Sequence, residues 1–300
     1  MELRHLRYFV AVAEEGSLTV AAERRLHTSQ PSLSRQIRDL EYEVGVPLLT
    51  RSVHGVELTS SGKAFLDHAR LALAQVEAAR EAARRAAQPE RPSLALGFLT
   101  GQEMDWLPEA MHLLRDELPN IDVTVTSGYS PNLAEGLTRG RLDLAFMRRE
   151  ADAVDLVFKT VMQEPLVAVL PSDHRLAGND SVEMQKIARE PFINVSKTAP
   201  ALRAVIDGYI RQSGLKITPA HEADNLAMAI SLVASTRGVA VLPRYAENFL
   251  PWSVVSRPIK GKPPTIDLVV GYHRANTSPI LRLFLSKVDE LIKRVEERAK

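Results

Sequence analysis

Residues 28–43, TSQPSLSRQIRDLEYE, carry the pattern of a short amphipathic helix. Apolar side chains recur at relative positions i, i+4, i+7 and i+11, namely Leu33, Ile37, Leu40 and Val44. This spacing places all four on one side of a helix, so they must be buried against other elements. Thr28 or Ser29 can cap the first free N–H groups, and Pro31 falls in the first turn, where a missing N–H costs nothing. The segment therefore predicts a helix with one buried side and one exposed side.

The residues before and after this helix complete a small domain. The spacing of apolar residues predicts a first helix over residues 3–13 and a second over residues 18–26, which Ser17 caps. A short turn leads from the second helix into the third. Residues 51–58 predict a hairpin that turns at His54-Gly55. Two helices joined by a tight turn and followed by a hairpin match a winged helix-turn-helix, whose second helix enters the major groove of DNA.

The exposed side of the third helix carries the candidate DNA contacts. At 100° per residue, Arg35 points away from the apolar stripe and can reach phosphates or base edges. The full set of candidates, including one at the start of the hairpin, is Thr28, Gln30, Pro31, Ser34, Arg35, Arg38 and Arg51. Arg35 and Arg51 can also be simple solvated charges, but their placement on the helix and at the hairpin start favours contact with DNA, and Arg38 can pair with Glu41 instead of a phosphate. Residues 1–62 hold seven Arg or Lys and eight Asp or Glu, so the prediction depends on where the arginines point rather than on bulk charge.

A long helix is predicted for residues 59–88. Thr59-Ser60-Ser61-Gly62 can cap its start, and Pro89 and Pro92 mark its end. Its small and apolar residues alternate at spacings of four and three, a heptad seam made of Phe65, Ala69, Ala72, Val76, Ala79, Ala83 and Ala86. At 1.5 Å per residue such a helix would be roughly 45 Å long. A solvated spacer is one interpretation, whereas an unburied Ala and Val seam favours pairing with a second copy of the chain.

From Ser93 onward, apolar segments of strand length alternate with helical patterns. Strands are predicted for residues 94–99, 121–126, 142–147, 166–170, 192–195, 217–221, 239–242 and 266–272. Helices are predicted for residues 104–118, 133–138, 182–188, 202–213, 226–235 and 279–298. This alternation favours an α/β fold with parallel sheets. A phosphate-binding glycine fingerprint is absent from the sequence, so a nucleotide-binding fold has little support.

Three strand-to-helix junctions in this part carry small hydroxyl or amide side chains. They are Thr100-Gly101-Gln102, Ser127 to Ser130, and Ser196-Lys197-Thr198. In open α/β sheets, ligands bind at the carboxyl ends of strands, where helix N-termini present free N–H groups. If the junctions converge, they predict an anion site in which Lys197 adds positive charge. Each hydroxyl can also be only a helix cap, and Arg148 and His273 are further candidates for the same cleft.

Composition and missing motifs exclude several classes of protein. Cysteine is absent, which excludes disulfides and thiol catalysis. The first residues do not form a signal peptide and no apolar run is long enough to span a membrane, so we expect a cytoplasmic protein without a membrane partner. A nucleophile elbow, an HExxH motif, a P-loop and a close set of His and carboxylate ligands are all missing. We therefore expect neither an enzyme nor a bound cofactor or metal.

An ordered set of motifs runs through residues 6–62: FVAVAEEGS, AAE, SQPSLSRQIRDLE, VGVPLL and LTSSG. This set strongly resembles the winged helix-turn-helix of LysR-type transcriptional regulators, especially regulators of aromatic-acid catabolism. The later motifs GRLDLAF, at residues 140–146, and GVAVLP, at residues 238–243, are also similar to motifs of that family. One departure is that Glu23-Arg24-Arg25 places one more residue before Leu26 than the family pattern has.

The resemblance implies a transcription factor in three parts. These are a winged helix-turn-helix DNA-binding domain at residues 1–59, a dimerising linker helix at 60–90 and an effector-binding domain at 91–300. The last part would resemble a periplasmic binding protein with a ligand cleft between two α/β subdomains, of which subdomain I is 91–161 plus 268–300 and subdomain II is 162–267. The family's effector-contact positions correspond to Thr100-Gly101, Ser130 and the segment Ser196 to Thr198.

The resemblance also implies partners. They are promoter DNA with an inverted-repeat site, a second copy bound through the linker helix, a homotetramer as the larger assembly, RNA polymerase, and a small effector, for which a carboxylate is the preferred class. The alternative is a cytoplasmic small-metabolite-binding protein without specific DNA regulation. That alternative accounts for residues 91–300 but leaves the first 58 residues unexplained.

Overall fold

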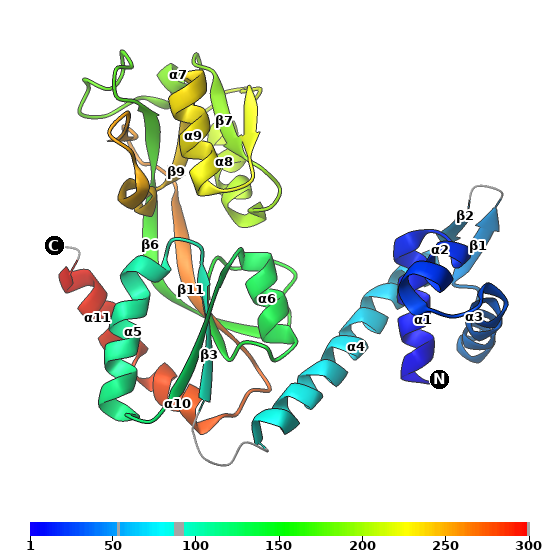
Figure 1. Ribbon diagram of the computed structural model, residues 1–300. Coiled ribbons are helices and arrows are strands. Elements are labelled where there is room, and N and C mark those ends of the chain that lie inside the picture. Colours follow the sequence, from blue (N-terminus) through cyan, green and yellow to red (C-terminus); the bar gives the residue numbers. More distant parts are fainter. Residues whose placement is uncertain (53–54, 87–92, 299–300) are drawn as a thin grey trace. The chain divides into compact units, whose positions relative to one another are not determined.

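The computed structural model describes residues 1–52, 55–86 and 93–298 of the 300-residue chain. The chain forms two compact units, Met1–Arg84 and Arg85–Lys300, and each contains its own hydrophobic core (Figure 1). The hairpin turn predicted at His54-Gly55 and the helix end predicted at Pro89 and Pro92 fall wholly or partly outside the described residues.

The N-terminal unit follows the predicted order of elements. They are α1 (Leu3–Glu15), α2 (Leu18–Val20), η1 (Ala21–Leu26), α3 (Gln30–Val44), β1 (Leu49–Ser52), β2 (Gly55–Leu58) and α4 (Ser60–Ala86). β1 and β2 pair antiparallel, with Leu49 opposite Leu58 and Ser52 opposite Gly55. The predicted winged helix-turn-helix followed by a long helix is therefore confirmed.

Local sequence explains where the helices begin and end. α1 ends at Gly16, which has a left-handed φ of 61° and donates its N–H to the carbonyl of Val12. α3 begins after Ser29, whose hydroxyl accepts a hydrogen bond from the N–H of Ser32, so Ser29 rather than Thr28 is the cap. The predicted apolar stripe of α3 enters a core shared with α1 and α4, formed in part by Leu33, Ile37, Leu40, Phe9, Val12 and Ala69.

The second helix is not the uniform α-helix that the sequence predicts. Only Leu18–Val20, capped by the Ser17 hydroxyl, is α-helical, and Ala21–Leu26 continues as a π-helix. A π-turn holds about one residue more than an α-turn. The π-helix includes Glu23-Arg24-Arg25, where the sequence suggests one more residue than the family pattern has, and the small pair Ala21-Ala22 is fully buried in the core.

The start of α4 packs closely against the segment before the hairpin. The hydroxyl of Thr59 accepts a hydrogen bond from the N–H of Gly62 at 2.9 Å and donates to the carbonyl of Pro47 at 2.9 Å, so the predicted cap is formed. Gly62 is buried, and a Cβ at this position would lie 2.0 Å from the carbonyl oxygen of Leu48. A side chain at position 62 therefore requires the backbone to shift.

We expect Gly62→Ala to lower the free energy of unfolding of the N-terminal unit by about 1–3 kcal/mol, because the added methyl group overlaps a backbone oxygen. Urea unfolding followed by circular dichroism measures the change. Gly208→Ala is the matched control, because a Cβ at Gly208 meets nothing within 4 Å and alanine suits a helix better than glycine. Wild-type stability of Gly62→Ala would contradict the close approach.

The C-terminal unit alternates strands and helices. Its elements are β3 (Ser93–Leu99), α5 (Glu103–Glu117), β4 (Asp122–Gly128), α6 (Ser130–Thr138), β5 (Leu144–Met147), β6 (Leu156–Pro171), α7 (Met184–Ile187), β7 (Phe192–Val195), α8 (Pro200–Gln212), β8 (His221–Ala223), α9 (Leu226–Thr236), β9 (Val239–Pro243), η2 (Arg244–Phe249), β10 (Val254–Pro258), β11 (Thr265–His273), α10 (Pro279–Ser286) and α11 (Val288–Arg298). The predicted α/β class is confirmed.

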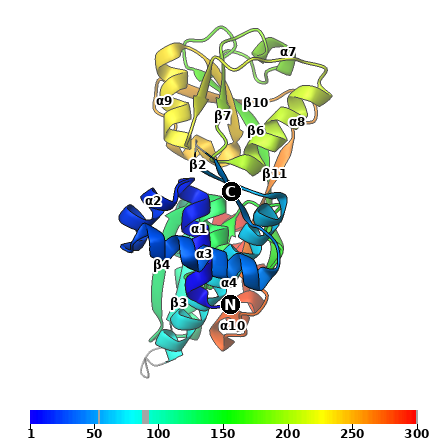
Figure 2. The same ribbon diagram turned by 90° about the vertical axis from the view of Figure 1, so that its right-hand side faces the viewer.

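The sheet is mixed rather than wholly parallel. Its strand order is β4-β3-β5-β11-β6-β9-β7-β8, and β10 pairs with β6. β3 is parallel to β4 and β5, and β7 is parallel to β8 and β9, whereas β6 and β11 run antiparallel to each other and to their neighbours β5, β9 and β10. The two antiparallel strands pass between two lobes of the unit, which are visible in Figures 1 and 2.

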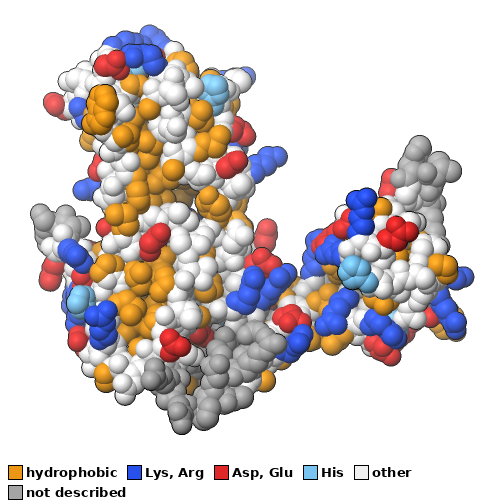
Figure 3. Space-filling view, in the orientation of Figure 1, with side chains coloured by type: hydrophobic (Ala, Val, Ile, Leu, Met, Phe, Trp, Pro, Cys, Tyr) orange, Lys and Arg blue, Asp and Glu red, His pale blue; other side chains and the backbone are white. Residues whose placement is uncertain are grey.

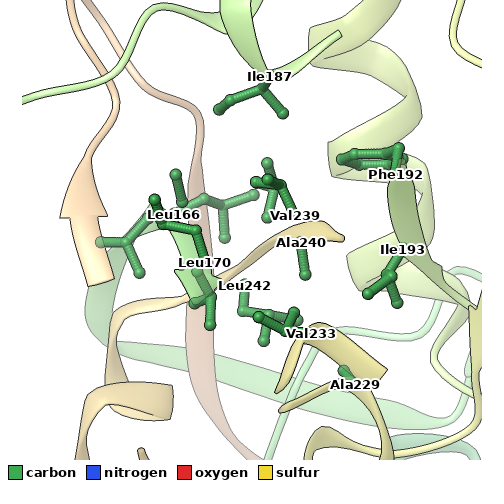
Figure 4. Packing of buried hydrophobic residues seen from close by; sticks show 14 of the residues in the cluster. Leu166, Leu170, Ile187, Phe192, Ile193, Ala229, Val233, Val239, Ala240 and Leu242 are labelled. Carbon is green, nitrogen blue, oxygen red and sulfur yellow. The ribbon is translucent and has the colours of Figure 1, made fainter. Parts of the chain in front are cut away.

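Each lobe has its own core. In the lobe that contains β3 and α5, the rings of Phe98 and Phe146 stack with centroids 5.0 Å apart, and Trp106 packs on Phe146 at 5.1 Å. The core of the other lobe surrounds β9 and contains mainly aliphatic side chains from β6, β7 and α9, as Figure 4 shows for Leu166, Ile193 and Val233. Both cores include residues of β6 and β11, so these strands connect one lobe to the other.

Some elements differ from their predicted bounds. β6 begins at Leu156, ten residues before the predicted strand. The sequence does not indicate this first half of the strand, because it carries polar side chains such as Lys159 and Thr160 and lacks a continuous apolar pattern. The sequence patterns do not indicate β10 or the short 3₁₀ helix η2. The predicted last helix is divided into α10 and α11 at Lys287.

Candidate functional site

The exposed side of α3 carries the arginine side chains that are predicted to meet DNA. The exposed candidates are Pro31, Arg35 and Arg38, and the half-buried ones are Thr28 and Gln30. Arg51 lies in β1, but its side chain is outside the described part of the structure. In Figure 3 the Lys and Arg side chains of this unit lie among Asp and Glu side chains rather than in a patch of one sign. Contacts from α3 would therefore depend on individual side chains.

Two predictions for α3 differ from the structure. Ser34 is predicted on the flank of the exposed side, but only 8% of it is exposed, because it lies at the edge of the buried stripe next to Ile37. The alternative pairing of Arg38 with Glu41 is also not what is seen. Oε1 of Glu41 accepts hydrogen bonds from the N–H groups of Leu48-Leu49 at 2.8 and 2.9 Å, and Nε of Arg38 donates to the carbonyl of Ser34 at 3.4 Å. Glu41 therefore anchors the segment that leads into the wing.

The seam of α4 is covered only at its start. Ala69 is buried and Phe65 is half-buried in the core of the N-terminal unit. Further along, Leu71 is 44% exposed, and Ala72, Ala79 and Ala83 are also exposed. A single chain therefore leaves the later part of the seam in contact with solvent.

The C-terminal unit contains a cavity of about 730 Å³, a size that suits a small metabolite. It is lined by residues from both lobes, at the carboxyl ends of β3, β5, β7 and β8. Most lining side chains are apolar, and they include Leu99, Val195, Leu202, Leu226, Ile230 and Phe249. Figure 3 shows apolar side chains on this face of the unit, including the region where the lobes meet. The cavity therefore suits a ligand with an apolar body.

The predicted ligand residues divide into two groups. Those that line the cavity are Thr100, Gly101, Ser130, Thr198 and Arg148, and those that do not are Gln102, Ser196, Lys197 and His273. Gln102 is fully buried and its Nε2 points to Glu164 at 3.4 Å. Ser196 is buried and its hydroxyl shares a hydrogen bond with that of Thr198. Lys197 is exposed and away from the lining, so the predicted extra positive charge in the cleft is wrong.

Arg148 and Glu164 form a buried ion pair beneath the cavity. Nη2 of Arg148 lies 2.6 Å from Oε2 of Glu164, and their side chains are only 5% and 4% exposed. The other oxygen of Glu164 accepts a hydrogen bond from the N–H of Tyr245 at 2.6 Å. Nη1 of Arg148 donates to the carbonyl of Ile266 in β11, and the backbone N–H of Arg148 donates to the hydroxyl of Ser130. The pair therefore links the end of β5 to β6, β11 and η2.

Tyr245 is a cavity residue that the sequence patterns do not reveal. Burial raises the pKa of its hydroxyl to about 12, so it stays protonated at neutral pH. The hydroxyl donates to the carbonyl of Thr100 in the other lobe at 3.4 Å, and the Arg148 guanidinium lies 5.9 Å from the centre of its ring. The only sequence signal that could have indicated it is its position two residues after the family-like GVAVLP motif.

Two helices begin at the cavity without a side-chain cap. The N-cap residues are Tyr129 for α6 and Ala199 for α8; both line the cavity, and neither caps its helix with its side chain. In contrast, the side chain of Asn225 caps α9 by accepting the N–H of Met228 at 2.7 Å. The first N–H groups of α6 and α8 can therefore serve an acidic group of a ligand.

Glu150 is a second cavity residue that the sequence patterns miss. Its Oε1 is buried and has no hydrogen-bond partner among the described residues. Burial, with a smaller contribution from the nearby charge of Asp152, raises the pKa of Glu150 from 4.5 to about 6. The folded protein therefore disfavours the ionised form of this carboxyl group.

We expect Glu150→Gln to be more stable than wild type at pH 7.5, by about 1–2 kcal/mol after allowance for solvent screening. The folded-state pKa of about 6 lies above the unfolded value of 4.5, so wild type gains stability as the pH falls from above 6 to 4.5. The neutral amide gains nothing from this proton uptake, and the difference should vanish near pH 4.5. Thermal unfolding at pH 7.5, 6 and 4.5 measures it, and a difference that does not change with pH would contradict the raised pKa.

Metal sites and membrane-spanning helices are both absent from the described part of the chain. Among the described residues, His, Asp and Glu side chains do not gather in a group that could hold a metal ion. Within the same residues, every helix is too short or too polar to cross a membrane.

Comparisons with known proteins match both units. The family model described as "Bacterial regulatory helix-turn-helix protein, lysR family" matches residues 3–63, and the one described as "LysR substrate binding domain" matches residues 87–292. The Hca operon transcriptional activator HcaR of Escherichia coli (strain K12) is 38% identical over 291 residues, which cover 97% of this chain and 98% of HcaR. The HTH-type transcriptional regulator AlsR of Bacillus subtilis (strain 168) is 34% identical over 286 residues, 95% of this chain and 94% of AlsR.

Solved structures agree over the whole length. Full-length BenM is 26% identical, with a TM-score of 0.60 over 100% of this chain and 98% of BenM. Full-length CbnR, solved in complex with its target DNA, is 25% identical, with a TM-score of 0.58 over 97% of this chain and 100% of CbnR. The chain therefore belongs to the LysR family, and it is a DNA-binding transcriptional regulator with an effector-binding domain rather than an enzyme.

Proposed function

We propose that this regulator binds an inverted-repeat site in promoter DNA and that its binding to that DNA changes when a small carboxylate enters the cleft of its effector-binding unit. The observation that carries the proposal is that one chain joins an α3 helix with exposed arginines to a separate unit with a metabolite-sized cavity. This work would take place in the cytoplasm, where the promoter DNA is.

The proposed DNA contacts lie on α3 and the wing. Arg35 and Arg51 would contact bases or phosphates, supported by Thr28, Gln30, Pro31 and Arg38. Arginine can bond O6 and N7 of guanine at once, and glutamine can do the same with N6 and N7 of adenine. Ser34 keeps a smaller role, because its burial leaves little of its side chain for DNA.

The proposed dimer forms through α4. Its exposed Ala seam beyond Ala69 would be covered by the same seam of a second copy, as heptad patterns require. A dimer presents two α3 helices, which favours a DNA site with two-fold symmetry. CbnR has been solved with its target DNA, which supports DNA binding by a full-length chain of this fold. A tetramer and contact with RNA polymerase are further parts of the proposal.

The proposed parts of the chain are residues 1–59, 60–90 and 91–300. The effector unit would divide into 91–161 plus 268–300 and 162–267, which agrees with its two cores: Val161 and Leu268 belong to one, and Leu166 and Ile266 to the other. The effector would place an acidic group at the free N–H groups of α6 and α8 and its apolar body among the aliphatic side chains. It alters DNA binding only if it binds one arrangement of the lobes better than the other.

We expect Ser130→Ala to weaken the response to an effector without changing DNA affinity. The Ser130 oxygen accepts the N–H of Arg148, which leaves its hydrogen free to bond an effector oxygen in the cavity. The loss should be about threefold to tenfold in the effector concentration for half response. A dose-response curve from a promoter reporter, with a gel shift as the DNA control, measures both activities. An unchanged curve would remove Ser130 from the effector site.

A further inference from the structure

We infer that Glu150 accepts a hydrogen bond from a hydroxyl group of the effector, so that this regulator senses a hydroxylated small acid. The inference rests on the proposed function, because it assigns a chemical class to the same cleft. It names a specificity contact that lies apart from the helix N-termini where the acidic group would bind.

The first argument is the state of the Glu150 carboxyl group. Glu150 lines the cavity, and its buried Oε1 has no partner among the described residues. Buried polar atoms in native proteins are nearly always bonded, so the unbonded oxygen of Glu150 calls for a partner that the described residues do not supply. An ordinary carboxylate oxygen offers only acceptor sites, so the missing partner is a hydrogen-bond donor.

The second argument is the balance of charge around the cavity. The charged lining residues are Glu103, Arg148, Glu150 and Asp224. Arg148 is bonded to Glu164, and Glu103 accepts the N–H of Gly101 and the hydroxyl of Ser127. Glu103, Glu150 and Asp224 all lack a cationic partner among the described residues, and of these three only Glu150 also has a buried oxygen without a hydrogen bond. A ligand that carried only acidic and apolar groups would leave the buried oxygen of Glu150 unsatisfied.

The third argument favours a hydroxyl over an ammonium group. The lining is mainly aliphatic, so a full positive charge placed beside Glu150 would lose much of its hydration there, a cost that one ion pair often fails to offset. A hydroxyl group loses much less on burial and still donates the hydrogen bond that Glu150 lacks. Since the N–H groups of α6 and α8 suit an acid, the two features together fit one hydroxy acid.

The test uses the full-length protein and matched probes. We would measure the affinities of benzoate, of 3- and 4-hydroxybenzoate, and of 3- and 4-methylbenzoate by titration calorimetry at pH 7.5. Hydroxyl and methyl groups are of similar size, so their comparison isolates the donated hydrogen. We expect at least one hydroxy acid to bind about tenfold or more tightly than its methyl counterpart, the range for a hydrogen bond to a charged group.

Glu150→Leu should abolish this preference, because leucine fills similar space without an acceptor. Asp152→Asn is the matched control: Asp152 is not among the cavity-lining residues, and its variant should keep the preference. Melting temperatures establish that both variants fold. Equal affinity of the hydroxy and methyl acids for wild type, or an unchanged preference in Glu150→Leu, would overturn the inference while leaving the proposed function intact. Failure of every probe to bind would contradict both the acid effector and this inference, and a gel shift with promoter DNA would still test the DNA-binding half separately.

Discussion

Glu164→Ala is expected to lower the free energy of unfolding of the C-terminal unit by about 3–5 kcal/mol. Removing one member of a buried ion pair leaves the other charge uncompensated in a site that excludes water. Here the loss leaves the guanidinium of Arg148 without its carboxylate and the N–H of Tyr245 without its acceptor. Urea unfolding followed by tryptophan fluorescence measures the change, because the chain's two tryptophans, Trp106 and Trp252, both lie in this unit.

Two further variants separate the buried charge from simple loss of contacts. Arg148→Met combined with Glu164→Leu removes both charges and should recover much of the lost stability, as apolar replacement of buried pairs often does. Lys260→Ala breaks an exposed pair with Glu183 and should leave the free energy of unfolding almost unchanged, because solvent screens such a pair. If Glu164→Ala cost no more than Lys260→Ala, the buried pair would not join the two lobes as described.

Arg35→Ala is expected to abolish specific DNA binding while ligand-induced stabilisation stays intact. Each bidentate contact between arginine and a base contributes about 1–3 kcal/mol of discrimination, and a dimer would lose two, so affinity for the native site should fall at least about thirtyfold. Because Arg35 is exposed and the core of its unit is formed by the opposite side of α3, the variant should fold normally. Gel-shift titration measures the affinity, and melting temperature measures the folding.

Arg4→Ala is the matched control for the change in net charge. Arg4 is exposed on α1 rather than on the second helix of the helix-turn-helix, and it pairs with Glu2 at 3.4 Å. Its loss should reduce affinity for all DNA sequences slightly and equally. If Arg35→Ala and wild type bound the native DNA site with equal affinity, the assignment of α3 as the helix that recognises the DNA sequence would be contradicted.

The sequence predicts the N-terminal unit well because local rules decide most of it. The stripe of Leu33, Ile37 and Leu40 and the caps at Ser17 and Thr59 are set by spacing and by side chains a few residues away. The burial of Ser34 and the π-helix could not be predicted in this way. Both depend on how closely neighbouring helices approach, which is a property of the packed unit.

The effector unit is predictable in class but less so in its site. Small hydroxyl residues after strands indicate Thr100, Ser130 and Thr198, which the structure brings together in the cavity lining because strand ends converge by topology. Lys197 fails because adjacent residues in a loop point in different directions. Arg148, Glu164 and Tyr245 come from separate strands and loops and contact one another only in the folded unit. Local sequence patterns therefore cannot predict the ion pair or the position of Tyr245 in the cavity. Local patterns do not reveal that β6 and β11 run antiparallel, for the same reason, although the subdomain bounds implied by the family resemblance fall within these two strands.

The most direct test of the central claim is a gel-shift titration of the purified full-length protein. It compares the DNA upstream of the protein's own gene with shuffled DNA of equal length, at two salt concentrations. Salt weakens contacts to phosphates, whatever the sequence, more than it weakens the difference between sequences. We predict tight binding that prefers the native DNA and keeps this preference at the higher salt concentration. Equal binding to both DNAs that disappears at the higher salt concentration, or no binding at all, would contradict sequence-specific recognition of this promoter through α3.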